Sequence, residues 1–282
     1  MGVGLMGVGL IRVGFIGLGS QGGPMARRII DAGYATTLWA RRPGTLAAFA
    51  DTSAKVAASP AELAADSDLV CICVVDDAGV DEVVGGEHGV LAGLRDGAVI
   101  AVHSTVHPDT CRRLEAEARP HGVGVVDATV SGGGIAAAEG RLLVMVGGEA
   151  ETVEFCRPVF ATYGDPIVHL GPLGSGQLTK LLNNVLFTAN LATAADTLAL
   201  GQSLEVDPGR LAEVISHGTA SSFALGRVAS AGGTLDRIAA HAGAVLRKDI
   251  QLMAALAAAA DLSTGIVVTA ADAALARMSH PR

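Results

Sequence analysis

The stretch Val13-Gly14-Phe15-Ile16-Gly17-Leu18-Gly19-Ser20-Gln21-Gly22 decides the fold of this 282-residue chain. Residues 12–17 form a short, apolar segment that is rich in β-forming side chains, which predicts a first strand. Residues 21–32 have the pattern of a helix, and Gly33 marks its C-terminal end. A strand that turns through glycines directly into a helix is typical of the first unit of a nucleotide-binding α/β domain.

Each glycine of the G-x-G-x-x-G spacing has a physical task in such a turn. Gly17 permits the tight turn, Gly19 lets a pyrophosphate approach the backbone, and Gly22 allows close packing of the helix on the strand. The N–H groups at the start of the helix then face the phosphates. The alternative is a glycine turn with a purely structural role. We predict a cofactor loop that comprises Gly17, Leu18, Gly19, Ser20, Gln21 and Gly22.

Further apolar strands alternate with helical patterns along the first 170 residues or so, which favours a doubly wound parallel sheet of the Rossmann type. Ser59-Pro60 has the signature of a helix start, with a serine cap before proline. A further helix is expected near residues 150–160. The remaining predicted strands are 36–39, 68–75, 97–102, 123–127, 142–146 and 167–169.

The pattern changes at the glycine-rich stretch 171–176, beyond which helical periods continue to the end of the chain. A long helix is expected near residues 176–204. We therefore predict an α/β Rossmann domain at 12–173 that binds NADP, and an all-helical domain at 174–282 that serves substrate binding and dimerisation. Residues 1–11 contain a direct repeat and a glycine motif that no strand precedes, so we expect a flexible leader there or an upstream alternative start.

The bulk composition excludes several classes of function. A net charge of −8 and a pI near 5.4 argue against a nucleic-acid partner. No apolar run reaches the ~18 residues that a membrane span needs. The four cysteines show no metal-ligand spacing, so no metal site is expected, and they suit the reducing cytoplasm.

The end of the second predicted strand indicates which nicotinamide cofactor fits. An NAD site usually carries an acidic residue there to hold the ribose hydroxyls. This chain instead has Trp39-Ala40-Arg41-Arg42-Pro43, which contains no carboxylate. Arg41 and Arg42, together with the backbone at Ala40, favour the 2′-phosphate of NADP over NAD. The alternative is an arginine pair on a solvated loop, with NAD still possible.

Lysine is scarce in this chain, and one lysine stands where chemistry needs it. The three lysines are Lys55, Lys180 and Lys248. Lys180 follows a glycine break and precedes Asn184 by four residues, so both project from one side of the same predicted helix. An ammonium beside a carboxamide can protonate a carbonyl oxygen and hold it in place. The alternative is a lysine on the solvated face of an amphipathic helix.

Four blocks of the chain resemble the β-hydroxyacid dehydrogenase family, typified by 3-hydroxyisobutyrate dehydrogenase. They cover residues 15–26, the segment Asp127-Ala128-Thr129-Val130-Ser131-Gly132-Gly133, the stretch 174–184 and the pair Lys248-Asp249. The order and co-occurrence of these blocks are more specific than any one block alone. The resemblance implies an NADP-dependent oxidoreductase that interconverts a small β-hydroxy acid and its semialdehyde.

The resemblance also implies a role for each matching residue. Lys180 would be the proton donor or acceptor, and Asn184 would orient the substrate oxygen or its carboxylate. Ser131, Gly132 and Gly133 would hold the substrate carboxylate, or a sulfonate. The residues that would line the cofactor site are Val74, Val75, Asp76, Ser104 and Thr105, and Lys248 would close the site over substrate and cofactor.

The chain departs from the usual family pattern at several positions. Thr129 stands where proline is common, and Val102 stands where aspartate precedes the Ser-Thr segment. These changes leave the substrate open. The alternatives on the same fold are an imine reductase or another carbonyl reductase. Imine reductases usually replace the catalytic lysine, so Lys180 argues against that branch. The rival from another class is a nucleotide-binding protein without turnover. The apolar surface of the helical domain predicts a homodimer or homotetramer.

Overall fold

The computed structural model describes residues 11–282, which divide into one compact unit that ends at Lys180 and another, Leu181–Arg282. The predicted boundary at 173/174 falls close to the start of the helix that continues from the first unit into the second. The predicted leader lies outside the described residues apart from Ile11. Ile11 itself is buried in a core cluster of the first unit.

The first unit is built on one sheet whose strand order is β3-β2-β1-β4-β5-β6-β7-β8 within the described residues. The strands from β1 to β6 are parallel, as predicted, and β7 runs antiparallel to β6. Only residues 132–141 separate β6 from β7, which is too short for the crossover that a parallel neighbour needs. The strands are β1 (Val13–Ile16), β2 (Thr36–Trp39), β3 (Lys55–Val56), β4 (Leu69–Ile72), β5 (Val99–Val102), β6 (Gly124–Ser131), β7 (Leu142–Gly147) and β8 (Gly164–His169).

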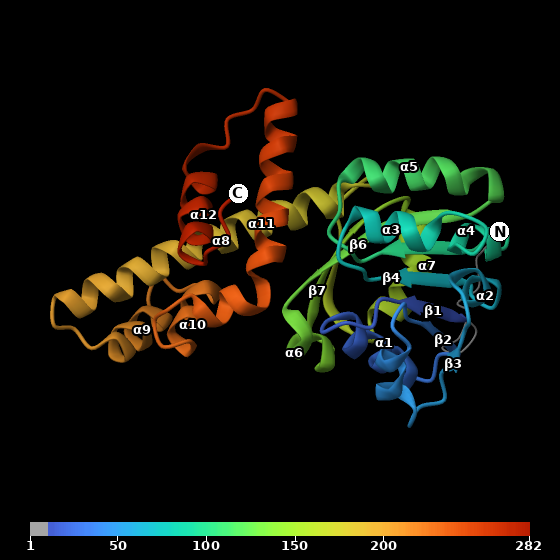
Figure 1. Cartoon of the computed structure of the whole chain (residues 1–282), viewed down its shortest axis with the longest axis horizontal. Coiled ribbons are helices and arrows are strands. Elements are labelled where there is room, and N and C mark those ends of the chain that lie inside the picture. The colour runs from blue at the N-terminus through green and yellow to red at the C-terminus, as the bar shows by residue number, and fades with distance from the viewer. Residues whose placement is uncertain (1–10) are drawn as a thin grey trace. The chain divides into compact units, whose positions relative to one another are not determined.

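Helices cover both faces of this sheet (Figure 1). A hydrophobic core lies between the sheet and the helices on each face. The central strands β1, β4 and β5 are buried at every position, because each face packs against helices. One face is covered by α1 (Gly22–Asp31), α6 (Gly133–Ala138) and α7 (Ala150–Phe160); the other is covered by α2 (Pro60–Ala65), α3 (Asp77–Val84), α4 (Val90–Gly93) and α5 (Pro108–Ala118). Two short 3-10 helices, η1 (Pro43–Phe49) and η2 (Arg119–His121), complete the unit.

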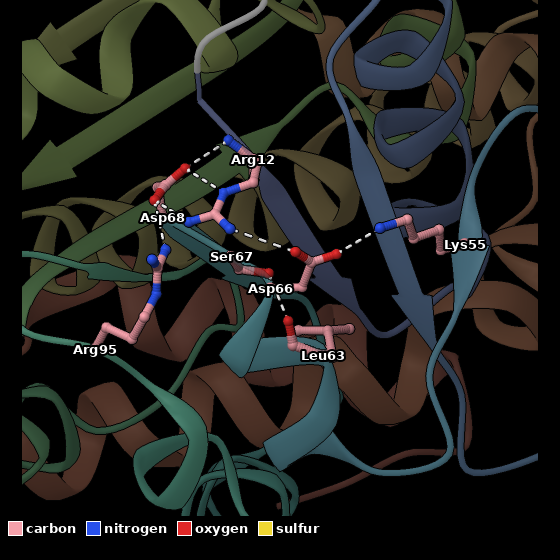
Figure 2. Close-up of polar contacts among 7 residues, drawn as sticks. All are labelled: Arg12, Lys55, Leu63, Asp66, Ser67, Asp68 and Arg95. Carbon is pink, nitrogen blue, oxygen red and sulfur yellow. Dashed lines mark hydrogen bonds and ion pairs between the residues drawn. The ribbon is translucent and has the colours of Figure 1, made fainter.

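An ion-pair network ties together the N-terminal ends of β1 and β4 (Figure 2). Asp68 accepts hydrogen bonds from the backbone N–H of Arg12 at 2.9 Å and from its guanidinium at 2.8 and 3.0 Å. Arg95 donates to the same carboxylate, and Asp66 bridges Arg12 and Lys55. These contacts fix how the two strands line up, at the end of the sheet opposite the one where ligands bind in such folds.

The second unit is entirely helical within the described residues. Its core is assembled from alanine, leucine, valine, isoleucine and one methionine, Met278, with no aromatic side chain fully buried in it. The helices are α8 (Ser175–Ser203), which starts in the first unit and matches the predicted long helix, α9 (Pro208–His217), α10 (Phe223–Ser230), α11 (Asp236–Ala259) and α12 (Gly265–Arg277). Among the described helices, none combines the length and the apolarity needed to cross a membrane.

Candidate functional site

A cavity of about 530 Å³ opens at the carboxyl ends of β1, β2 and β4. The chain order reverses here, since β2 lies on one side of β1 and β4 on the other, and such a switch point is where open α/β sheets bind ligands. Its volume is in the range of small-molecule and cofactor sites. Nine predicted cofactor residues line it: Gly17, Leu18, Gly19, Ala40, Arg41, Arg42, Val74, Val75 and Asp76.

The three glycines of the loop meet the geometric demands of a pyrophosphate site. Gly17 has a positive φ of +98°, and a Cβ there would lie 2.1 Å from the carbonyl oxygen of Cys73. A Cβ on Gly22 would lie 2.0 Å from the carbonyl oxygen of Gly17, so the start of α1 packs directly on the turn. A Cβ on Gly19 would meet nothing within 4 Å. The backbone at Gly19 is therefore exposed to a ligand, and the residues present fit a dinucleotide.

Two arginines and a carboxylate stand at the end of the cavity formed by β2 and α3. Arg41 is exposed and forms an ion pair of 2.9 Å with Glu82 of α3, and both residues line the cavity. Arg42 is also exposed and lines the same wall. The sequence indicated no acidic residue at this strand end, but the fold brings Glu82 in from α3 as an ion-pair partner of Arg41.

The segment after β4 forms the opposite wall. Asp76 caps α3 by accepting the N–H of Gly79 at 2.9 Å, and the apolar side chain of Val75 is 69% exposed beside the cavity. Ser104 lies behind this wall rather than in the cavity, since it is buried and its hydroxyl accepts the N–H of Val74 at 2.8 Å. Thr105 follows it and is half-buried.

The predicted substrate segment lies at the end of β6, against the glycine loop. Gly132 and Gly133 have positive φ angles of +131° and +74°, which residues with a side chain rarely adopt. A Cβ on Gly134 would lie 2.4 Å from the carbonyl oxygen of Ser20, so the two backbones are in close contact. The structure thus places Ser131 and its glycines next to the cofactor loop.

The start of α8 is anchored to β6 by a buried carboxylate. Asp127 accepts the N–H of Gly174 at 2.7 Å and that of Gln177 at 2.6 Å. Burial raises the pKa of this carboxyl, and the backbone N–H donors oppose the rise. Thr129, which stands in the place of the usual proline, donates its hydroxyl to the carbonyl oxygen of Gly176 at 3.0 Å. The departure from the family pattern therefore helps to hold the helix that carries Lys180.

Lys180 and Asn184 both lie on α8, four residues apart, as predicted. Asn184 is buried, and its amide donates to Asp249 at 2.6 Å while its oxygen accepts from Asn183 at 3.0 Å. Asp249 is fully buried and forms an ion pair with Lys248 at 2.9 Å. Lys248 and Asp249 are neighbours on α11, and the long lysine side chain brings its ammonium back to the Asp249 carboxylate. The same carboxylate accepts the Asn184 amide and so orients it.

Four residues that contribute to this arrangement were not assigned roles from the sequence: Glu82, Asp127, Gln177 and Asp249. Only Glu82 carried no signal, because Asp127, Gln177 and Asp249 each belong to a block that resembles the dehydrogenase family. No group of histidine, cysteine or carboxylate side chains suited to a metal ion is found among the described residues.

Comparison with known families and proteins gives a consistent result over nearly the whole chain. Residues 12–171 match the model described as the NAD binding domain of 6-phosphogluconate dehydrogenase. Residues 174–280 match the model described as NAD-binding of NADP-dependent 3-hydroxyisobutyrate dehydrogenase. The two matches meet close to the start of α8.

Individual relatives support the same grouping. An uncharacterized oxidoreductase of Mycobacterium tuberculosis is 35% identical over 71% of this chain and 68% of its own length. The NAD-dependent L-serine dehydrogenase of Pseudomonas aeruginosa is 33% identical over 74% of this chain and 70% of its own length. The solved structure of Mycobacterium tuberculosis 3-hydroxyisobutyrate dehydrogenase with L-serine has a TM-score of 0.83 at 26% identity, covering 96% of this chain and 94% of that one.

Proposed function

Because the chain belongs to the β-hydroxyacid dehydrogenase family of nicotinamide-dependent enzymes that act on CH–OH groups, we propose that it interconverts a small β-hydroxy acid and its semialdehyde with NADP. The observation that carries the proposal is the cavity at the ends of β1, β2 and β4. It combines the exposed backbone of Gly19 with two arginines, Arg41 and Arg42. A diphosphate and a further phosphate on the ribose match that distribution of donors.

In this proposal the loop Gly17–Gly22 holds the pyrophosphate and the wall at Val74–Asp76 contacts the remainder of the dinucleotide. Ser104 supports the wall from behind through Val74, and Thr105 follows toward the nicotinamide end. The nicotinamide supplies the hydride chemistry, and the protein supplies binding, orientation and a proton. Lys248 of α11 is proposed to close over cofactor and substrate.

The substrate carboxylate is proposed to bind at Ser131, Gly132 and Gly133, where a hydroxyl and backbone N–H groups are available. Lys180 gives a proton to the carbonyl oxygen during reduction and removes one from the hydroxyl during oxidation. Asn184, held by Asp249, orients the substrate. The same carboxylate site suits a sulfonate, which presents a similar set of acceptor oxygens.

The test of this function is a panel of candidate substrates assayed with NADPH and NADH by coenzyme absorbance. The panel contains small semialdehydes and glyoxylate for reduction, 3-hydroxyisobutyrate and L-serine for oxidation, and cyclic imines. We expect turnover of one hydroxy acid or its semialdehyde, with NADP(H) preferred. Activity confined to imines indicates an imine reductase instead. Tight NADPH binding without turnover of any compound indicates a nucleotide-binding protein.

The arginine pair gives a separate prediction for the coenzyme. Replacing Arg41 and Arg42 together by alanine should raise the KM for NADPH by roughly 10- to 100-fold, because each charge-assisted contact is worth about 1.5–3 kcal/mol before screening. The KM for NADH should change by less than about threefold, as NADH lacks the third phosphate. Steady-state kinetics with both coenzymes measures the ratio. Equal effects on NADPH and NADH would contradict the assignment.

Glu82→Gln is the complementary variant, because it releases Arg41 without removing it. We expect the KM for NADPH to fall a few-fold and the KM for NADH to stay constant. Arg112→Ala serves as the control, since Arg112 is an exposed arginine of α5 that does not line the cavity. A change of coenzyme preference in that control would indicate a general charge effect.

We further propose a homodimer or homotetramer that forms through the helical unit. Large apolar side chains are exposed on its helices, at Leu182, Leu186, Leu200, Val214, Phe223 and Ile266. A particle mass of one chain, 28.3 kDa, in light scattering would exclude this.

The four thiols form no disulfide, which supports the proposed location in the reducing cytoplasm.

A further inference from the structure

Gln177 is a polar side chain with no exposed surface, on the first turn of α8. Its carboxamide reaches across to the segment after β5. The oxygen accepts the backbone N–H of Val106 at 3.0 Å, and the nitrogen donates to the carbonyl oxygen of Ser104 at 2.8 Å. A second contact of the nitrogen, at 3.7 Å, is with the sulfur of Cys111. The amide orientation is therefore determined, because only this one gives a donor to Ser104 and an acceptor to Val106.

Ser104 continues the chain of contacts to the cofactor cavity. Its hydroxyl oxygen accepts the N–H of Val74, a residue of the cavity wall. Its backbone N–H donates to Ile72 at the end of β4. Gln177 is thus linked through one residue to the wall that is proposed to contact the dinucleotide.

The other end of the link is rigid. Gln177 donates its own backbone N–H to the buried Asp127, and the neighbouring Gly176 accepts from Thr129. A Cβ on Gly176 would lie 2.5 Å from the carbonyl oxygen of Met145, so the first turn of α8 packs directly on the sheet. Lys180 follows Gln177 by three residues, about 4.5 Å along the helix axis.

An apolar side chain of the same size would fill this space without the cost of burying an amide, which is about 1–3 kcal/mol when hydrogen bonds are lost. It would leave the carbonyl of Ser104 and the N–H of Val106 without these partners. The presence of a buried amide at position 177 is therefore explained by its hydrogen bonds to the Ser104 carbonyl and the Val106 N–H rather than by packing.

We propose that Gln177 is a positioning residue that keeps the Ser104–Val106 segment, and with it the nicotinamide end of the cofactor site, in fixed register with the helix that carries Lys180. The proposal rests on the proposed function, because this register matters only if Lys180 exchanges a proton with a substrate that lies beside the nicotinamide. It adds a residue that touches neither substrate nor cofactor. Hydride and proton must be delivered to neighbouring atoms of one substrate, and a misplacement of about 1 Å costs on the order of 100-fold in rate.

The test compares Gln177→Glu with Gln177→Met over a range of pH. A protonated glutamic acid accepts from Val106 through its carbonyl and donates to Ser104 through its hydroxyl, as the amide does. An ionised carboxylate has no donor, so one of its oxygens would face the Ser104 carbonyl oxygen and be repelled by it. We expect kcat of Gln177→Glu to be reduced about 100-fold at high pH and to recover to within about tenfold of wild type at low pH, with the KM for NADPH changed by less than about threefold. Gln177→Met should be slow at every pH.

Two titratable groups contact Gln177, namely Cys111 on α5 and Asp127 on β6. Burial raises the pKa of the Cys111 thiol, which stays neutral, and burial also raises the pKa of Asp127. Both are present in wild type, so the ratio of variant to wild-type kcat at each pH isolates position 177. Gln202→Glu, an exposed site near the end of the same helix, is the matched control and should keep the wild-type profile.

Three outcomes would overturn the proposal: full kcat in Gln177→Met, a pH-independent loss in Gln177→Glu, or losses that follow the fall in melting temperature of each variant. If the wild type turns over no member of the panel, the proposed function fails on its own evidence. The positioning role is then measured from the fluorescence of bound NADPH. We expect Gln177→Met to alter that emission at unchanged Kd, and an unaltered emission would contradict the role.

Discussion

Lys180→Met should lower kcat by about 10²- to 10⁴-fold, the range that positioned proton transfer contributes in enzymes. Methionine is an unbranched side chain of similar length and helix propensity, and it removes the ammonium with its proton and its charge. The coenzyme cavity is lined by residues that precede position 84, so the Kd for NADPH should stay within about threefold of wild type. Single-turnover kinetics with the best substrate of the panel and fluorescence titration of NADPH measure the two quantities.

Lys55→Met is the matched control for this variant. Lys55 lies on the edge strand β3, and its exposed ammonium pairs with Asp66 at 2.8 Å at the opposite end of the sheet. Removing such a surface pair changes stability by about 0–1 kcal/mol, and kcat should be unaffected. Full activity in Lys180→Met, or equal losses in both variants, would remove Lys180 from the mechanism.

The parts of the fold that could be predicted are those in which burial leaves a local pattern. Strands β1, β4 and β5 are apolar at every position because helices cover both faces. The edge strand β3 has two exposed residues and therefore no such pattern. The direction of β7 depends on the length of the connection from β6 rather than on its own residues. Strand β6 continues to Ser131 because β7 pairs with it along that length.

The same division applies to the candidate site. Glycine spacing and the Arg41-Arg42 pair are local signals, and the cavity lies where they place it. Glu82 and Gln177 act through partners 41 and 73 positions away in the chain, at Arg41 and Ser104. Such partners follow only from the packed structure. Ser104 is an example: the resemblance implies a place beside the cofactor, and only the packed structure shows that its hydroxyl accepts the N–H of Val74 in the cavity wall.

The buried imidazole of His103 should make the stability of the Rossmann unit depend on pH. The ring is buried beside Phe15 and Phe160, and its Nδ1 lies 2.6 Å from the carbonyl oxygen of Ala128. Nδ1 therefore donates, and Nε2 is left to accept from the hydroxyl of Tyr163 at 3.2 Å. This arrangement requires the neutral imidazole. Burial lowers the pKa of His103 from 6.5 to about 4, partly opposed by the bond to Ala128.

A histidine with a lowered pKa in the folded state stabilises the fold above the unfolded pKa. Between pH 6.5 and about 4 the unfolded chain binds a proton that the folded chain does not, so the free energy of unfolding falls as the pH falls. At 1.36 kcal/mol per unit, the loss by about pH 5 is about 2 kcal/mol. His103→Asn keeps a donor for Ala128 and cannot be protonated.

Urea unfolding of wild type and His103→Asn at several pH values therefore gives a specific expectation. The asparagine variant is less stable at about pH 7.5, because the smaller side chain leaves a cavity, and the gap should shrink by about 2 kcal/mol by about pH 5. Asp127 has a raised pKa and shifts stability in the opposite direction, but it does so in both proteins and cancels in the difference. Parallel stability curves would contradict this expectation, because they would mean that His103 carries the same charge in the folded and the unfolded chain.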